Sequence, residues 1–219
     1  MNQIVGVIQV KGGVGRSTIA TNLAAVLSLK KPTALIDCDL PQGTSASWYA
    51  VRKSEVPPTN LTLAIVRDYR ELINVVVEAS RNHRYIVIDG PPRIAEMTRA
   101  ILVMSTLCLV PLGASGAEIW STADLLTTID EARQYRPDID VRIVWNRFRG
   151  HTREAHDLSE AALKELGLKE LDTRLGYRVA YSEALARGLS VDEWLDKIAH
   201  AEILSLAAEV KGILKEKGK

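Results

Sequence analysis

The sequence alternates between short apolar runs and longer segments with apolar residues at helical spacing. Continuous apolar runs of this kind are typical of strands buried on both faces of a parallel sheet. Between them, segments such as 18–29 place Ile19, Leu23 and Leu27 on one side of a helix. The alternation predicts one α/β domain over residues 1–219, with a mostly parallel, twisted sheet covered by helices on both faces. The predicted strands lie at residues 4–8, 33–38, 61–66, 85–89, 109–112 and 141–145.

Composition agrees with a single domain. The chain has 219 residues, of which 47% are hydrophobic, and it contains no internal repeat or low-complexity linker. Pro57 and Pro58 predict a surface loop before the strand at 61–66. Cys38 and Cys108 both lie in apolar runs without metal-ligand spacing, so we expect two buried free thiols rather than a metal site or a disulfide.

A glycine-rich loop follows the first predicted strand and precedes the first predicted helix. Residues 8–18 read Ile-Gln-Val-Lys-Gly-Gly-Val-Gly-Arg-Ser-Thr. The glycines permit positive φ, so backbone N–H groups converge on an anion at the positive end of the helix dipole. A glycine-rich turn that binds nothing is the alternative, and the strand-loop-helix context disfavours it. The residues predicted to contact nucleotide phosphates are Gly12, Gly13, Val14, Gly15, Arg16, Ser17 and Thr18, with the Ser17 hydroxyl also in the Mg²⁺ shell.

Arg16 occupies the lysine position of the pattern G-x-x-x-x-G-K-[ST]. Arginine keeps the charge, but its planar fork does not reproduce an ammonium group between β- and γ-phosphate oxygens. Nucleotide binding with slow hydrolysis is therefore one expectation. A tolerated variant with ordinary turnover is the other, and the sequence does not say whether Arg16 is native or was introduced.

Acidic residues end two of the predicted strands. Asp37 and Asp39 close the run that begins at Thr33, and Asp89 closes the run that begins at Tyr85. An apolar strand that ends in aspartate is the Walker B arrangement, which places a negative charge beside Mg²⁺ and the γ-phosphate. Such residues also cap helices in many proteins, which is the plainer alternative. We expect Asp37, Asp89 and Ser17 near the metal ion.

The segment 11–18 resembles the deviant Walker A box K-G-G-x-G-K-[ST]-[ST] of the ParA/MinD superfamily, and it departs from that box only at Arg16. The resemblance implies a P-loop NTPase fold, ATP or ADP with Mg²⁺ as ligands, and an ATP sandwich homodimer. It also implies a catalytic role for Lys11, which in this family reaches across the dimer to the partner's phosphates. An ordinary solvated lysine is the alternative.

Four further segments extend the resemblance from Ile4 to about Trp194. Residues 37–44 are similar to the family's D-x-D-P-Q switch I segment with Leu40 inserted, which implies that Asp39 positions or activates the attacking water and leaves the role of Gln42 open. Residues 141–147 resemble the strand that ends in Asn-Arg, which implies that Asn146 reads the adenine edge and that Arg147 lies in the nucleotide site. The other two similar segments are 109–120 and 178–191.

The chain most resembles the short ParA proteins that lack an N-terminal DNA-binding extension. The resemblance implies that the ATP dimer binds nonspecific DNA, that hydrolysis releases it, and that a ParB-like or other cargo adaptor stimulates hydrolysis. The cargo would be a plasmid, a chromosome or a protein assembly. With a net charge of only +1, DNA contacts must come from local clusters and depend steeply on salt. The candidate DNA contacts are Arg147, Arg149, Arg174 and Lys197.

Three alternatives stay open: a hydrolysis-deficient ATP-binding scaffold, a MinD-like membrane-associated ATPase, and a small-molecule enzyme similar to dethiobiotin synthetase. The end of the chain disfavours the membrane-associated alternative, because residues 209–217 contain only Val210, Ile213 and Leu214 as apolar residues. We expect a frayed helical tail over about 200–219 rather than a membrane anchor. The start predicts no signal peptide, and the expected location is cytoplasmic and nucleoid-associated.

Overall fold

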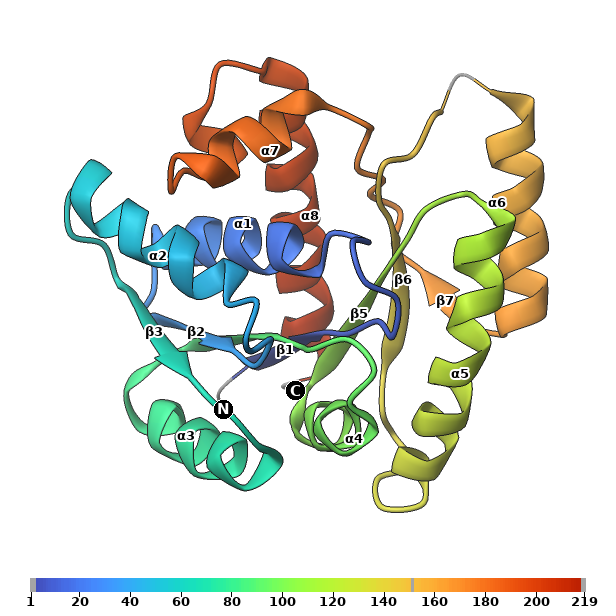
Figure 1. Cartoon of the computed structure of the whole chain (residues 1–219), viewed down its shortest axis with the longest axis horizontal. Helices are drawn as coiled ribbons and strands as arrows, with labels where there is room; N and C mark the ends of the chain where they lie inside the picture. Colours follow the sequence, from blue (N-terminus) through green and yellow to red (C-terminus); the bar gives the residue numbers. More distant parts are fainter. Residues whose placement is uncertain (1–2, 151, 218–219) are drawn as a thin grey trace.

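The computed structural model describes residues 3–150 and 152–217, and in this part of the chain seven parallel strands form one sheet (Figure 1). The strand order is β3-β2-β4-β1-β5-β6-β7. The predicted α/β fold is confirmed. The strands are β1 Gln3–Val7, β2 Thr33–Asp37, β3 Leu61–Ile65, β4 Tyr85–Asp89, β5 Leu107–Leu112, β6 Val141–Trp145 and β7 Lys169–Glu170. The helices are α1 Arg16–Ser28, α2 Thr44–Glu55, α3 Tyr69–Asn82, α4 Ala95–Met104, α5 Gly116–Arg133, α6 Arg153–Leu166, α7 Val179–Ala186 and α8 Lys197–Lys217, with a 3₁₀ turn η1 at Val191–Glu193.

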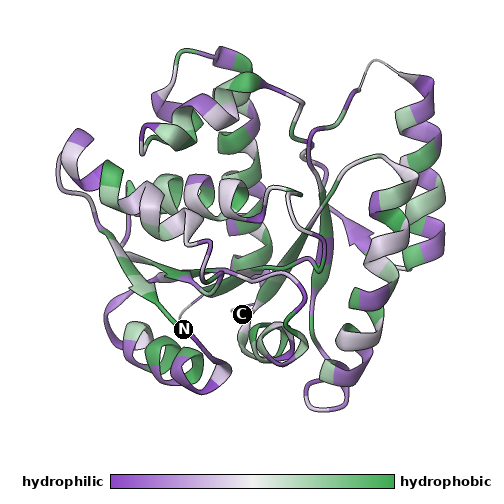
Figure 2. Ribbon diagram, in the orientation of Figure 1, coloured by the Kyte–Doolittle hydropathy of each residue, from purple (hydrophilic) through white to green (hydrophobic). Residues whose placement is uncertain are grey.

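Two layers of helices bury the two faces of the sheet. Successive side chains of a strand point to opposite faces, so Val87 packs against α1 and α8, whereas Ile86 and Ile88 pack on the face of α3, α4, α5 and α6. Both faces are therefore apolar, as the continuous hydrophobic runs predicted. Figure 2 shows the central strands in the green of hydrophobic residues, while the outer helices alternate between green and purple.

Observed boundaries follow the predicted ones closely. The first helix extends over 16–28 instead of 18–29, because it begins directly at the glycine loop. The fifth strand starts at Leu107, two residues before its predicted start. Pro57 and Pro58 lie in the predicted loop between α2 and β3. Both cysteines are buried and free, as expected.

The C-terminal segment differs from its prediction. The expected tail is helical over residues 200–217, which form most of α8, but it packs on the domain instead of being frayed; residues 218–219 lie outside the described part. Val210 and Leu214 are fully buried, and the Gln3 side-chain amide donates to the Leu214 carbonyl at 2.9 Å. The prediction considered only the last apolar residues, whereas Ile203 and Leu206 continue the same stripe toward the sheet. Its apolar face is thus core, not a free anchor, and no described helix is long and apolar enough to span a membrane.

Candidate functional site

The glycine loop, residues 8–15, joins β1 to α1 at the carboxyl edge of the sheet. β1 lies between β4 and β5 in the sheet. The chain leaves β1 toward β2 on one side and later returns to β5 on the other, and open α/β sheets bind ligands at such switch points. Gly13 and Gly15 have φ of +75° and +94°. A Cβ on Gly15 would lie 2.2 Å from Nδ2 of Asn146, so this position accepts only glycine.

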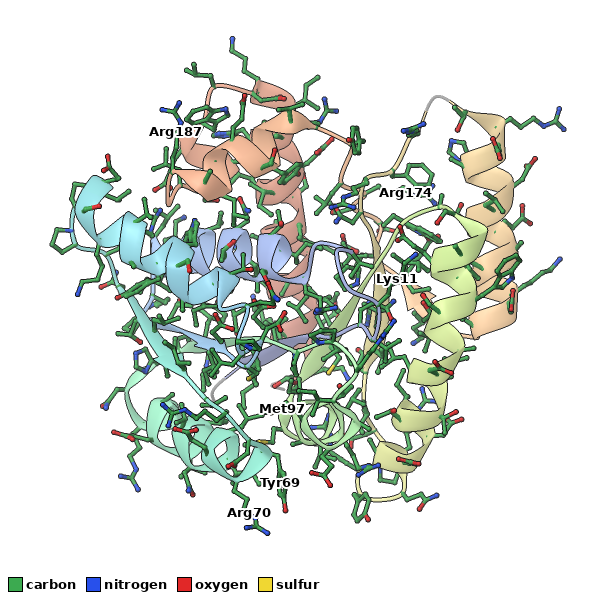
Figure 3. The ribbon with its side chains drawn as sticks, in the orientation of Figure 1. Lys11, Tyr69, Arg70, Met97, Arg174 and Arg187 are labelled. Atoms are coloured by element: carbon green, nitrogen blue, oxygen red, sulfur yellow. The ribbon has the colours of Figure 1, made fainter. Side chains whose placement is uncertain are left out.

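The loop is open on its outer side. Gly12 and Gly13 are exposed, and a Cβ at either would meet no atom within 4 Å. Ser17 and Thr18 are half-buried in the first turn of α1, where backbone N–H groups lack helical partners. Lys11 is half-exposed and makes no ion pair in the described part of the chain (Figure 3). The loop therefore presents N–H groups, hydroxyls and one uncommitted ammonium group.

Arg16 points inward rather than toward the open side of the loop. Its side chain is 5% exposed. Nε donates to the Gly90 carbonyl at 2.8 Å, and Nη1 donates to the carbonyls of Gln9 at 2.8 Å and Lys11 at 2.6 Å. Nη2 lies 3.5 Å from Oδ2 of Asp39. Three of its five N–H groups are thus committed to backbone carbonyls, and the two on Nη2 face Asp39 or remain without a contact in the described residues.

The structure brings the predicted aspartates together. The register of β2 and β4 pairs Asp37 with Asp89, and that of β1 and β4 pairs Val7 with Asp89. Asp37 is buried, and its two oxygens accept from the backbone N–H groups of Asp39 at 2.9 Å and Ala46 at 2.8 Å. Burial raises the pKa of Asp37 despite these bonds. Asp37 thus fixes the backbone of the switch I segment.

Asp89 is completely buried and only half satisfied. Its Oδ2 accepts from the Ser45 hydroxyl at 2.7 Å, while Oδ1 has no hydrogen-bond partner among the described residues. Burial raises the pKa of Asp89 to about 7, and the hydroxyls of Ser45 and Ser17 partly offset the rise. A buried oxygen without a partner marks a place for an additional ligand. Asp89 and Ser17 therefore fit Mg²⁺, while each oxygen of Asp37 already accepts one backbone N–H.

A cleft of about 440 Å³ opens beside the glycine loop. At its inner end the Asn146 amide nitrogen donates to the Val14 carbonyl at 2.7 Å, and the Asn146 side-chain oxygen accepts from the Arg147 N–H at 3.0 Å. The Asn146 amide nitrogen carries two hydrogens, so one remains for a base edge. Arg147 is exposed and has φ of +53°. The cleft is lined by Gly15, Thr18, Asn146, Arg147, Gly176, Tyr177, Arg178, Val179, Tyr181, Ser182 and Leu185.

The outer wall of this cleft depends on residues that the sequence did not predict. Glu202 on α8 accepts from the Gly176 N–H at 3.2 Å, from Nε of Arg178 at 3.0 Å and from the Tyr181 hydroxyl at 2.9 Å. Asn22 of α1 accepts from the Ser190 hydroxyl and the backbone N–H of the next residue. No local pattern marks these contacts, because their partners are far apart in sequence.

An ion pair between buried Arg52 and the more exposed Glu193 joins α2 to the same part of the chain. Arg52 donates from Nη1 and Nη2 to the two oxygens of Glu193 at 2.7 and 2.8 Å, and also to the Gly188 carbonyl at 3.1 Å. The Trp48 indole donates to the Leu189 carbonyl at 3.0 Å. The helix that follows switch I is thereby bound to the segment after α7.

The four candidate DNA contacts occupy different environments. Arg149 is exposed and stacks over Tyr177, and Arg174 stacks over Phe148 at 4.5 Å and pairs with Glu170 at 3.3 Å. Arg149 and Arg174 line one groove of about 710 Å³, and Arg147 and Arg149 line its neighbour. Lys197 is the exposed first residue of α8 and lines neither groove. The two neighbouring grooves bring three of the four together, and Figure 3 shows Arg174 on the same side of the view as Lys11.

The fold and this site define a P-loop nucleotide-binding protein. The model of the CobQ/CobB/MinD/ParA nucleotide binding domain matches residues 5–191, and the chain belongs to this family.

Relatives and solved structures cover nearly the whole chain. The Maintenance of carboxysome distribution protein A of Halothiobacillus neapolitanus is 26% identical over 96% of this chain and 94% of its own length. The Sporulation initiation inhibitor protein Soj of Bacillus subtilis is 24% identical over 96% of this chain and 98% of its own length. Apo McdA of Cyanothece superposes with a TM-score of 0.74 at 18% identity, covering 98% of this chain and 100% of its own. MinD in the MinC:MinD complex of Aquifex aeolicus gives 0.77 at 17% identity, with 96% of each chain covered.

Proposed function

We propose that this chain is a Mg²⁺-dependent ATPase of the ParA type, which forms a homodimer with ATP and positions or partitions a cargo. The observation that carries the proposal is the meeting of an open glycine loop, an uncommitted Lys11 and the carboxylates of Asp39 and Asp89 at one edge of the sheet. ParA/MinD members of the family are ATPases, which supports the same reaction here.

Each group has a distinct task in the proposed reaction. The N–H groups of residues 12–15 and of Thr18 hold the phosphates, and Asn146 and Arg147 contact the base side. Ser17 and Asp89 hold Mg²⁺, which neutralises charge on the β- and γ-phosphates when bound, and Asp37 orders switch I beside them. Lys11 supplies positive charge to the partner's phosphates, and Asp39 orients the attacking water. Loss of the γ-phosphate then weakens the dimer.

Cargo positioning is proposed from the names of the relatives. They include a protein for maintenance of carboxysome distribution and a chromosome partitioning protein ParA of Myxococcus xanthus. In this proposal the cytoplasmic ATP dimer binds nonspecific DNA of the nucleoid through Arg147, Arg149, Arg174 and Lys197. A ParB-like or other adaptor on the cargo stimulates hydrolysis. Binding through phosphate contacts predicts a steep loss of DNA affinity with salt.

A hydrolysis-deficient ATP-binding scaffold is the second candidate. The ion pair between Arg16 and Asp39 favours it, because a carboxylate held by a guanidinium does not orient water. A MinD-like membrane attachment has less support, because the apolar residues of α8 are buried in the core.

Phosphate release separates these candidates. The purified chain is incubated with Mg·ATP alone, with random-sequence DNA, and with anionic lipid vesicles, and Asp39→Ala serves as the inactive control. Turnover that rises with DNA and disappears in Asp39→Ala supports the ParA-type ATPase. Saturable ATP binding without turnover in any condition supports the scaffold, and stimulation by vesicles alone supports the membrane-associated reading.

A further inference from the structure

Arg16 joins three separate segments of the candidate site: the glycine loop, the turn after β4 and switch I. One guanidinium bonds the carbonyls of Gln9 and Lys11 in the glycine loop, the Gly90 carbonyl after β4, and the carboxylate of Asp39 in switch I. These groups lie up to 74 residues from Arg16 in sequence. Only arginine can make this arrangement, since its planar fork carries five N–H donors, whereas lysine has three on a single nitrogen.

The four contacts are unequal. The three bonds to carbonyls measure 2.6–2.8 Å and are buried or partly buried, and breaking them would leave inner carbonyl oxygens without a donor. The contact to Asp39 is longer, at 3.5 Å, and involves one oxygen. When the site rearranges, the contact to Asp39 is therefore the one that yields first.

The charges around Arg16 explain why the contact to Asp39 forms. Asp39 is 8% exposed, and Asp89 and Asp37 are fully buried. Arg16 is the basic side chain in contact with Asp39 of this acidic cluster, while Lys11 makes no ion pair in the described residues. The γ-phosphate brings more negative charge to the same place, and its repulsion of the Asp39 carboxylate loosens the contact with Nη2.

We propose that Arg16 is a positioning residue rather than a phosphate ligand: it braces the glycine loop against Gly90 and holds Asp39 in an inactive position until ATP displaces switch I. The proposal rests on the ATPase function proposed above. In this proposal Arg16, which stands where the family pattern has lysine, keeps the nucleotide-free enzyme inactive. Lys11 then supplies the positive charge near the γ-phosphate.

A double-mutant cycle tests the brace. Arg16→Lys, Asp39→Asn and the double variant are unfolded by urea, first without nucleotide and then with Mg²⁺ and a slowly hydrolysed ATP analogue. Without nucleotide we expect the unfolding equilibrium constant of the double variant to differ by about tenfold from the value expected if the two single effects were independent. With the analogue this difference should fall below about twofold. The matched control is Arg52→Lys with Glu193→Gln, an ion pair of another buried arginine outside the glycine loop and switch I, whose coupling should not change with nucleotide.

Additive effects without nucleotide, or coupling that persists with the analogue, would overturn the proposal. A second measurement needs no variant at Arg16: NMR exchange of the side-chain Nε–H with water in the unmodified chain. Arg16 Nε donates to Gly90, whereas Arg52 Nε is equally buried but has no partner among the described residues. We expect Arg16 to exchange at least about tenfold more slowly without nucleotide. Equal rates would contradict the brace. The coupling between the variants and the Nε–H exchange rate are both measured without nucleotide, so both keep their meaning even if the chain hydrolyses no ATP. Failure of the ATPase proposal can therefore be distinguished from failure of the brace.

Discussion

The phosphate end and the base end of the cleft are built in different ways. At the phosphate end, the glycine loop and the three aspartates come from short motifs at the ends of β1, β2 and β4. At the base end, the wall at residues 176–191 is held by Glu202, Asn22 and Arg52, which lie on three separate helices. The phosphate end is therefore defined locally, and the base end depends on how distant helices pack.

Mutations at the two ends of the cleft should therefore have different consequences. At the phosphate end a substitution changes a charge that acts on the reaction or on Mg²⁺. At the base end a substitution loosens a wall and changes nucleotide affinity, with little effect on the chemical step. The predictions below separate these two behaviours.

The largest effect is expected for Asp39→Ala. Removing the carboxylate that orients water should lower the rate of phosphate release at saturating ATP by about 10³-fold. Nucleotide affinity, measured with a fluorescent ATP analogue, should change less than about threefold. A variant that retains more than a tenth of the turnover would remove Asp39 from the proposed mechanism.

Asp89→Asn should stabilise the nucleotide-free chain at alkaline pH. The pKa of Asp89 is raised from 3.8 to about 7, so the folded state binds its proton more tightly and stability falls as pH rises from about 4 through about 7. Asparagine removes this fall, with a gain on the order of 3 kcal/mol in the free energy of unfolding at pH 8 and almost none at pH 4. Urea unfolding of both proteins at pH 4 and pH 8 measures this gain in stability. The same gain at both pH values would contradict the burial of an ionisable Asp89.

The same variant should also lose its response to Mg²⁺. In the unmodified chain, Mg²⁺ requires the ionised carboxylate, so the affinity for Mg·ADP should weaken as pH falls below about 7. Calorimetric titration across pH 6–8 should show a steeper slope in the unmodified chain than in Asp89→Asn, because the terminal phosphate of ADP also titrates at about pH 6 and contributes equally to both. An equal slope in the variant would place the titrating group of the protein elsewhere.

At the base end, Glu202→Gln should weaken nucleotide binding by about tenfold, because the bonds from Arg178 and Tyr181 lose the carboxylate charge of their acceptor. Turnover at saturating ATP should stay within about twofold. Glu209→Gln is the matched control: Glu209 lies on the same helix and accepts from two backbone N–H groups at Asp172 and Thr173, away from the cleft. If both variants bind nucleotide equally well, Glu202 does not shape the wall.

The smallest effects are expected for the basic residues near the base end. Arg147→Ala should lower DNA affinity by about threefold and reduce the slope of log affinity against log salt by about 1, because Arg147 is exposed and uncommitted. Arg174→Ala should change the slope less, since Arg174 is paired with Glu170. Fluorescence anisotropy at several salt concentrations distinguishes them. Unchanged slopes in both variants would move the DNA interface elsewhere.

The sequence predicted the two ends unequally for the same physical reason. Six of the seven described strands, the glycine loop and the three aspartates follow from hydrophobic period and residue spacing within a few positions, whereas the two-residue strand β7 is too short to leave such a pattern. The inward turn of Arg16 does not, because it depends on the Gly90 carbonyl, 74 residues away. The burial of α8 was missed because Val210 and Leu214 pack against strands from the other end of the chain. The bond between Asn22 and Ser190 spans 168 residues, beyond any local pattern.

The proposed switch requires ATP to join two copies of this chain. Light scattering after size-exclusion chromatography measures the molar mass and shows whether it does. The unmodified chain and Asp39→Ala are measured without nucleotide and with Mg·ATP. The account predicts a mass near the single-chain 24.1 kDa without nucleotide and twice that mass with Mg·ATP, with a more persistent dimer for Asp39→Ala. The same single-chain mass in every condition, with ATP bound, would contradict the dimerising switch.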